Sequence, residues 1–236
     1  MLKNIEKNYS PNFDLLKRIE NKIRFIIIHY TGMRKETDAL RRLTNIQSQV
    51  SCHYFIKYNG KIIELVPDLY VAWHAGRSKW KNYKSLNYSS LGIEISNPGH
   101  EYDYKNYNKK QISSLIYLLK NLVKKYKINS KNILGHSDIA PDRKKDPGEK
   151  FPWKILAKNK VSFWHKLKQK ELIKLRNIKS SKNEKLGFFK NLCKIGYSSK
   201  NKLAVTKAFQ RRFRQELVNG KIDKECIKIC NSLASI

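Results

Sequence analysis

A short, continuous apolar run at Arg24–His29 constrains most strongly how this chain can fold. It holds three consecutive isoleucines, and β-branched residues favour extended backbone. A strand that is apolar at nearly every position is typical of a sheet buried on both faces. Further runs at Leu91–Ser96 and Asn132–Leu134 predict neighbouring strands. The sheet therefore needs helices to cover it.

Two other patterns predict those helices and a hairpin. Apolar residues recur with the helical period of 3.6 residues in Glu36–Ile46 and Lys110–Lys127. The segments His53–Tyr58 and Lys61–Val66 flank an Asn-Gly pair, which predicts a β-hairpin with a type I′ turn. Strands and helices in this order predict an α/β fold with a mixed central β-sheet flanked by helices.

The last third of the chain has a different composition. A polar, lysine-rich stretch is interpreted as a partly helical linker. Apolar periodicity then returns, and turns at Gly196 and Asn219-Gly220 predict three short helices. The predicted organisation is a domain at 1–160, a linker at 161–185 and a small three-helix domain at 186–236.

The net charge of +31 raises the question of nucleic-acid binding, because a phosphate backbone attracts a basic face. However, 39 of the 50 basic residues are lysine, a bias that we interpret as solvated surface. Zinc-finger spacing, an RNP-like aromatic motif and a convincing helix-turn-helix are all missing from the sequence. We therefore expect no specific nucleic-acid partner.

A membrane span and a disulfide scaffold are also not expected. The apolar runs, such as Phe25–Ile28, are far shorter than the roughly 18 residues that a membrane helix needs. Four cysteines are too few for a disulfide framework in a chain of 236 residues. Cys226 and Cys230 could form a metal pair, but two small buried residues are the favoured interpretation. No feature specifies an oligomeric state.

Three polar residues lie where the predicted strands end. His29 ends the first strand, His136 follows the last, and Asp146 lies in the loop after it. Ligand sites form at the ends of strands in such sheets, so these side chains can converge. Two histidines and one carboxylate are the ligands of a hydrolytic zinc ion, although each residue alone would be weak evidence.

A set of motifs makes the pattern far more specific. The motifs are His29-Tyr-Thr-Gly, Ser51-Cys-His-Tyr, Trp73-His-Ala-Gly76, Leu91-Gly-Ile-Glu-Ile-Ser-Asn97, Gly135-His-Ser-Asp-Ile-Ala-Pro, Arg143-Lys-Lys-Asp-Pro-Gly148 and Phe151-Pro-Trp153. Together they resemble the zinc-dependent N-acetylmuramoyl-L-alanine amidases, a family that includes the AmpD and AmiD types, amidase-type phage lysozymes and animal peptidoglycan-recognition proteins. The resemblance covers roughly residues 22–158.

The resemblance implies a role for each site residue. His29, His136 and Asp146 fall on the ligands of one Zn²⁺ ion. Glu94 falls on the catalytic glutamate, and Lys144 falls on the lysine that assists the tetrahedral intermediate. The chemistry agrees, because amide hydrolysis needs an activated water, a base and positive charge for the developing oxyanion. Alternation along the strand turns Glu94 away from the neighbouring isoleucines.

Three positions refine the match. Cys52 stands where some members carry a tyrosine that assists catalysis, which leaves the acid–base work to the glutamate and the lysine. Lys145 could be confused with Lys144, but the spacing from the predicted ligands favours Lys144. An aspartate as the third ligand, where some phage members use cysteine, is nearer the bacterial AmpD and AmiD types.

The other histidines have weaker assignments. His74 resembles a family loop near the substrate groove, so we predict it as a substrate-binding residue, with simple packing as the alternative. His53 lies in a predicted hairpin strand and is expected to be structural. His100 and His165 match no motif and are expected at the surface.

The C-terminal segment resembles a peptidoglycan-binding three-helix module, through Ala-Phe-Gln210 and Gly220-Lys-Ile-Asp223. Such a module is typical of AmiD-type rather than AmpD-type enzymes. The resemblance therefore implies hydrolysis of the amide between N-acetylmuramic acid and L-alanine in peptidoglycan or muropeptides. A non-catalytic peptidoglycan-recognition protein is the alternative.

Two features favour different locations. A wall-binding module favours the periplasm or cell envelope. The first eleven residues have no apolar core of a standard secretory signal, which favours the cytoplasm. We expect the periplasm or envelope, with the cytoplasm as the alternative.

Overall fold

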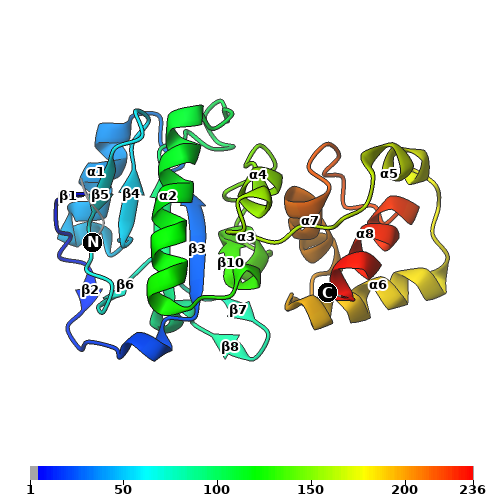
Figure 1. Ribbon diagram of the computed structural model, residues 1–236, viewed down its shortest axis with the longest axis horizontal. Coiled ribbons are helices and arrows are strands. Elements are labelled where there is room, and N and C mark those ends of the chain that lie inside the picture. Colours follow the sequence, from blue (N-terminus) through cyan, green and yellow to red (C-terminus); the bar gives the residue numbers. More distant parts are fainter. Residues whose placement is uncertain (1–4, 236) are drawn as a thin grey trace.

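The structure is a computed structural model that describes residues 5–235 (Figure 1). Within that range, no helix is both long and apolar enough to cross a bilayer. The strands are β1 (Glu6–Lys7), β2 (Phe13–Asp14), β3 (Phe25–Tyr30), β4 (Tyr54–Ile56), β5 (Ile62–Glu64), β6 (Val71–Ala72), β7 (Lys79–Trp80), β8 (Tyr83–Lys84), β9 (Ser90–Ile95) and β10 (Ile133–Gly135). The α-helices are α1 (Glu36–Thr44), α2 (Lys109–Tyr126), α3 (His136–Ile139), α4 (Trp153–Lys158), α5 (Gln169–Leu175), α6 (Lys182–Ile195), α7 (Lys202–Phe213) and α8 (Lys224–Ala234).

The main sheet has the order β1-β5-β4-β9-β3-β10. Strands β4, β9, β3 and β10 are parallel to one another, whereas β5 runs antiparallel to β4. The predicted α/β fold with a mixed sheet is confirmed. Because the four parallel strands point the same way, their carboxyl ends meet at one edge of the sheet.

Each face of the sheet is covered by a different set of helices. Even-numbered positions of β3, such as Ile26 and Ile28, pack with the apolar face of α2. Odd-numbered positions, such as Phe25 and Ile27, pack toward the C-terminal helices. Helix α1 covers the same side over β4 and β5. Figure 1 shows α2 in front of the sheet and α6–α8 beyond its β10 edge.

The predicted hairpin forms, but the prediction of a type I′ turn is wrong. The amide of Gly60 donates to the carbonyl of Lys57 at 2.9 Å, and the amide of Lys57 donates to the carbonyl of Lys61 at 2.9 Å. A type I′ turn needs two positive φ angles, and in this loop only Gly60 has one, at 87°. The connection is therefore a three-residue loop with glycine at its left-handed position.

Three C-terminal helices form, as the apolar periodicity predicts, but the first begins earlier. Helix α6 starts at Lys182 rather than near residue 186, because Ser181 and Glu184 form a capping box around a polar first turn. The predicted linker contains α5, which packs on α8. The division of the chain into two domains and a linker stays a prediction.

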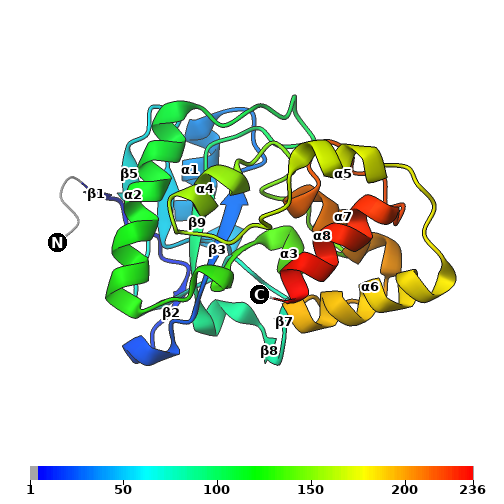
Figure 2. The same cartoon turned by 45° about the vertical axis from the view of Figure 1, so that its right-hand side comes forward.

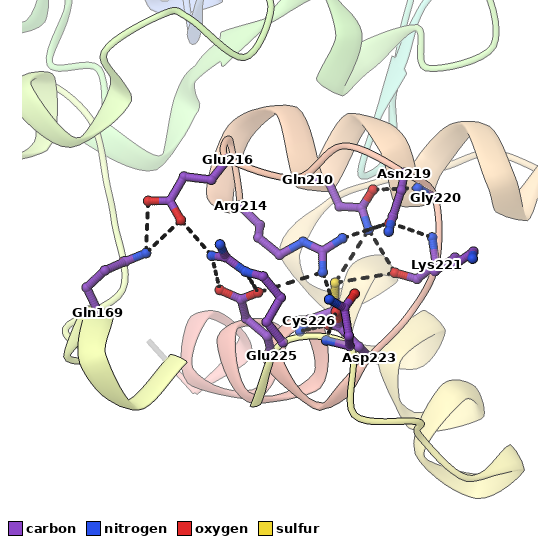
Figure 3. Close-up of polar contacts among 12 residues, drawn as sticks. Gln169, Gln210, Arg214, Glu216, Asn219, Gly220, Lys221, Asp223, Glu225 and Cys226 are labelled. Atoms are coloured by element: carbon purple, nitrogen blue, oxygen red, sulfur yellow. Dashed lines mark hydrogen bonds and ion pairs between the residues drawn. The ribbon is translucent and has the colours of Figure 1, made fainter. Parts of the chain in front are cut away.

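A polar cluster holds the loop between α7 and α8 (Figure 3). The Gln210 side chain accepts from the Gly220 amide at 2.7 Å and donates to the Lys221 carbonyl at 2.9 Å. Buried Arg214 contacts the Asp223 carboxylate at 2.5 Å. The Ala-Phe-Gln and Gly-Lys-Ile-Asp elements therefore stabilise the loop between α7 and α8.

A buried ion pair joins the C-terminal helices to α3, which follows the last strand of the sheet. Arg212 of α7 lies 2.5 Å from the Asp138 carboxylate of α3, and both side chains are almost fully buried. The Tyr197 hydroxyl donates to the same carboxylate at 2.6 Å. Asp138 also accepts from the Gly135 amide at 2.8 Å. Figure 2 shows α3 directly beside the C-terminal helices, and this buried ion pair is one of the polar contacts between them.

Substitution of Arg212 by methionine is expected to lower the free energy of unfolding by about 3 kcal/mol, because it leaves the buried Asp138 without its counter-charge. Arg211→Met, on the same helix but only partly buried, is the matched control and should cost less than about 1 kcal/mol. Equilibrium urea unfolding of both variants measures the difference. Equal losses in both would contradict a specific anchoring role.

Candidate active site

A pocket of about 370 Å³ opens between α1 and the loop that follows α3. It lies over the carboxyl ends of β3 and β9, on the face opposite α2. Its volume is within the range of small-ligand sites. All six predicted site residues line it: His29, His74, Glu94, His136, Lys144 and Asp146.

The parallel register brings the predicted residues together. His29 of β3 pairs directly with Glu94 of β9, so their side chains emerge side by side on one face of the sheet. His136 is the first residue of α3, immediately after β10. The amide of the neighbouring Ser137 donates to the carbonyl of Asp146 at 2.8 Å, which brings the loop back to the strand ends.

Three donor atoms converge at the base of the pocket. Nδ1 of His29 lies 3.0 Å from Nδ1 of His136 and 3.0 Å from Oδ2 of Asp146, and the latter two atoms are 3.1 Å apart. All three residues are buried, and they are the one candidate metal-binding group within residues 5–235. Tetrahedral ligands at zinc bond lengths lie about 3.3 Å apart, so this triangle fits one metal ion.

The protonation states suit metal binding. Burial and the adjacent His136 lower the pKa of His29 to about 4, so its ring is neutral at pH 7. Burial alone would raise the pKa of Asp146, but the two histidines outweigh it and hold that pKa below its ordinary value. A neutral imidazole and an ionised carboxylate are the forms that bind metals.

Glu94 has a carboxylate oxygen without a partner. Its Oε2 atom is buried and accepts no hydrogen bond from any described residue, yet the side chain lines the pocket. Burial and the charge of Asp146 raise the pKa of Glu94 well above its ordinary value, and Lys144 and Arg42 partly offset this shift. An unpaired carboxylate with a raised pKa is suited to proton transfer.

Both lysines of the loop line the pocket, but their surroundings differ. The charge of Lys144 acts on the pKa of both Glu94 and His29, and its side chain is half-buried, whereas that of Lys145 is exposed. The choice of Lys144 over Lys145 is consistent with this geometry, and its catalytic role stays a prediction.

His74 lies in the pocket wall with both ring nitrogens engaged by protein groups. Its Nδ1 atom is 3.1 Å from Nε2 of His29, and its Nε2 atom is 3.3 Å from the Ser90 hydroxyl. Its predicted contact with substrate stays a prediction. His53 is structural, as expected, because its Nδ1 atom accepts from the Gly92 amide at 2.9 Å.

Other assignments need correction or addition. His165 is buried beside Trp164, so its expected surface position is wrong. Pocket residues that the sequence analysis did not single out include Arg42 of α1 and Arg143. Arg143 directly precedes Lys144 in one of the motifs, and that position could have identified it as a pocket residue. Arg42 belongs to no motif.

The comparisons with known proteins identify the family of this chain. The family model described as N-acetylmuramoyl-L-alanine amidase matches residues 19–149. The chain is 34% identical to N-acetylmuramoyl-L-alanine amidase AmiD of Escherichia coli K12, over 90% of this chain and 82% of AmiD. It is 39% identical to the 1,6-anhydro-N-acetylmuramyl-L-alanine amidase AmpD of the same strain, over 44% of this chain and 55% of AmpD.

Solved structures extend the similarity to almost the whole chain. E. coli AmiD in complex with its substrate anhydro-N-acetylmuramic acid-L-Ala-D-gamma-Glu-L-Lys has a TM-score of 0.80 at 32% identity, covering 91% of this chain and 89% of that chain. AmpDh3 of Pseudomonas aeruginosa with anhydromuramic pentapeptide also has a TM-score of 0.80, at 28% identity, covering 100% and 98%. The matched residues 19–149 and the similarity to AmiD show that this chain belongs to the N-acetylmuramoyl-L-alanine amidase family.

Proposed function

We propose that this protein is a zinc-dependent amidase that hydrolyses the bond between the lactyl group of N-acetylmuramic acid and L-alanine of the stem peptide. The observation that carries the proposal is the convergence of His29, His136 and Asp146 beside the unpaired carboxylate of Glu94. Family membership supports the same bond as the target. A receptor that had lost catalysis would not need this complete donor set.

The three donors would hold one Zn²⁺ ion. Two imidazole nitrogens and a carboxylate oxygen are a common ligand set of catalytic zinc, with a further position left for water or substrate. When bound, zinc supplies a Lewis acid that polarises the amide carbonyl and lowers the pKa of the attacking water.

The chain's own residues supply the proton transfers and a positive charge. Glu94 accepts a proton from the attacking water as its oxygen bonds to the carbonyl carbon. The Lys144 ammonium stabilises the negative charge that develops on the carbonyl oxygen. Glu94 then returns the proton to the amide nitrogen as the carbon–nitrogen bond breaks. The products are a lactyl carboxylate and the ammonium group of L-alanine, which takes up the second proton of the water.

The pocket is rich in positive charge, which suits the carboxylates of a stem peptide. Arg42, Arg143 and Lys145 line it together with Lys144. The AmiD and AmpDh3 structures hold anhydromuramic peptides. We therefore propose that anhydromuramic peptides are among its substrates, and competition with muropeptides that carry ordinary muramic acid would measure the preference.

Removal of the metal is expected to abolish release of stem peptides. Dialysis against a chelator should reduce amidase activity on a purified muropeptide to background, and one equivalent of Zn²⁺ should restore it. Chromatographic detection of the released peptide is the readout. Full activity of a protein shown to be metal-free by elemental analysis would contradict the mechanism.

We also propose that the enzyme acts in the cell envelope, where α6–α8 bind peptidoglycan. The resemblance of this segment to a wall-binding module supports the proposal. Fractionation of native cells is the test, and recovery of the protein only in the cytosol would contradict an envelope location.

A further inference from the structure

We infer that His74, oriented by Ser90, is a positioning residue that fixes the tautomer of His29 and so directs the Nδ1 lone pair of His29 at the metal. This inference rests on the proposed metal site. It assigns His74 a role within the protein rather than in contact with the substrate. Four groups are linked by successive hydrogen bonds: the Leu86 carbonyl, Ser90, His74 and His29.

This series of hydrogen bonds begins at a backbone carbonyl. The Ser90 hydroxyl lies 2.6 Å from the carbonyl oxygen of Leu86. A carbonyl can only accept, so the single hydroxyl hydrogen of Ser90 is used there. The Ser90 oxygen can then only accept from His74, whose Nε2 atom is 3.3 Å away. This contact favours the tautomer of His74 with its hydrogen on Nε2.

The tautomer of His74 in turn sets the tautomer of the metal ligand His29. The neutral imidazole of His74 carries one hydrogen, which the contact with Ser90 places on Nε2. With the hydrogen on Nε2, Nδ1 of His74 is an acceptor, and it lies 3.1 Å from Nε2 of His29. His29 therefore donates from Nε2, which leaves its Nδ1 lone pair facing Asp146 and His136.

The second histidine ligand is oriented from the neighbouring residue. Nε2 of His136 donates to the carbonyl of Ala75 at 3.1 Å, so its Nδ1 lone pair also faces the donor triangle. The amides of His74 and Ala75 both donate to Oδ1 of Asn87, at 3.2 and 2.7 Å. One short segment thus orients both imidazole ligands, and a single asparagine holds that segment.

The strand beneath His74 is shaped to admit its ring. Ser90, Gly92 and Glu94 alternate along one face of β9. A β-carbon at Gly92 would lie 2.4 Å from Cγ of His74, a distance that no side chain can tolerate. The glycine therefore lets the imidazole lie against the strand, between the serine that orients it and the carboxylate of Glu94.

The test is zinc affinity, measured by competition with a chelator of known affinity on the full chain. His74→Ala should weaken zinc binding about 10- to 100-fold, the usual effect of losing an outer-shell partner. His74→Asn should recover most of the loss, because its Oδ1 atom can accept from Nε2 of His29. Ser90→Ala should weaken binding less than His74→Ala. The control is His100→Ala, a histidine outside this chain of hydrogen bonds, which should bind zinc like the wild type.

The tautomer itself is a second readout. Long-range ¹H–¹⁵N spectra of the metal-free protein should show the hydrogen of His29 on Nε2, and His74→Ala should give a mixture of tautomers. Wild-type zinc affinity and an unchanged tautomer in His74→Ala would overturn this inference alone. A wild-type protein without zinc affinity would overturn the proposed function as well. If His74→Ala does not fold, Ser90→Ala applies the same two criteria.

Discussion

Glu94→Gln should lower kcat for muropeptide hydrolysis about 1000-fold, within the range that general acid–base groups contribute. Glutamine has nearly the same shape but cannot accept a proton from water. The unpaired Oε2 atom and the raised pKa of Glu94 indicate that this carboxylate is free for proton transfer rather than bound in a structural contact. Steady-state kinetics on a purified muropeptide, with zinc content measured in parallel, gives the result.

A matched control separates this role of Glu94 from the general effect of replacing a carboxylate on a strand. Glu64→Gln replaces another partly buried strand carboxylate, whose pKa is also raised by burial but which lies outside the pocket. It should retain near wild-type activity. Substantial activity in Glu94→Gln with full zinc occupancy would remove Glu94 from the mechanism. A loss of zinc together with activity would instead indicate a role in holding the site.

Local patterns predicted the sheet well because its strands are short, apolar and buried on both faces. The run ending at His29 and the strand carrying Glu94 were visible from residue type and alternation alone. Their pairing in parallel register brings the two side chains together. The motifs then predicted which polar residues meet, since strand ends on one edge of a sheet converge.

Contacts between distant, individually ordinary residues could not be predicted in this way. Nothing in the sequence around Arg212 indicates that it pairs with Asp138, 74 residues earlier. Ser90 is likewise an unremarkable strand residue until the fold places it beside His74. The start of α6 was missed for a different reason, because its first turn is polar and only its cap marks it. Such features depend on tertiary packing or on short caps rather than on apolar periodicity.

Asp146→Ala should weaken zinc binding by more than 100-fold and abolish amidase activity, because it removes one of three ligands rather than a supporting hydrogen bond. The remaining Nδ1 atoms of His29 and His136, 3.0 Å apart, would lack the anionic member of the set. Asp142→Ala, an exposed carboxylate of the same loop that contacts Ser199, is the control and should bind zinc normally. Chelator competition and elemental analysis measure both variants.

Asp146→Cys tests whether the position needs an anionic metal ligand or only its hydrogen bonds to the histidines. A thiolate is an excellent zinc ligand but a weak hydrogen-bond acceptor. The cysteine variant should therefore recover zinc affinity that the alanine variant lacks, and with Co²⁺ it should give the intense thiolate charge-transfer absorption. Zinc affinity as low as that of Asp146→Ala, without this absorption, would argue that Asp146 orders the two imidazoles and does not bind the metal. Recovery would place the carboxylate of Asp146 among the ligands.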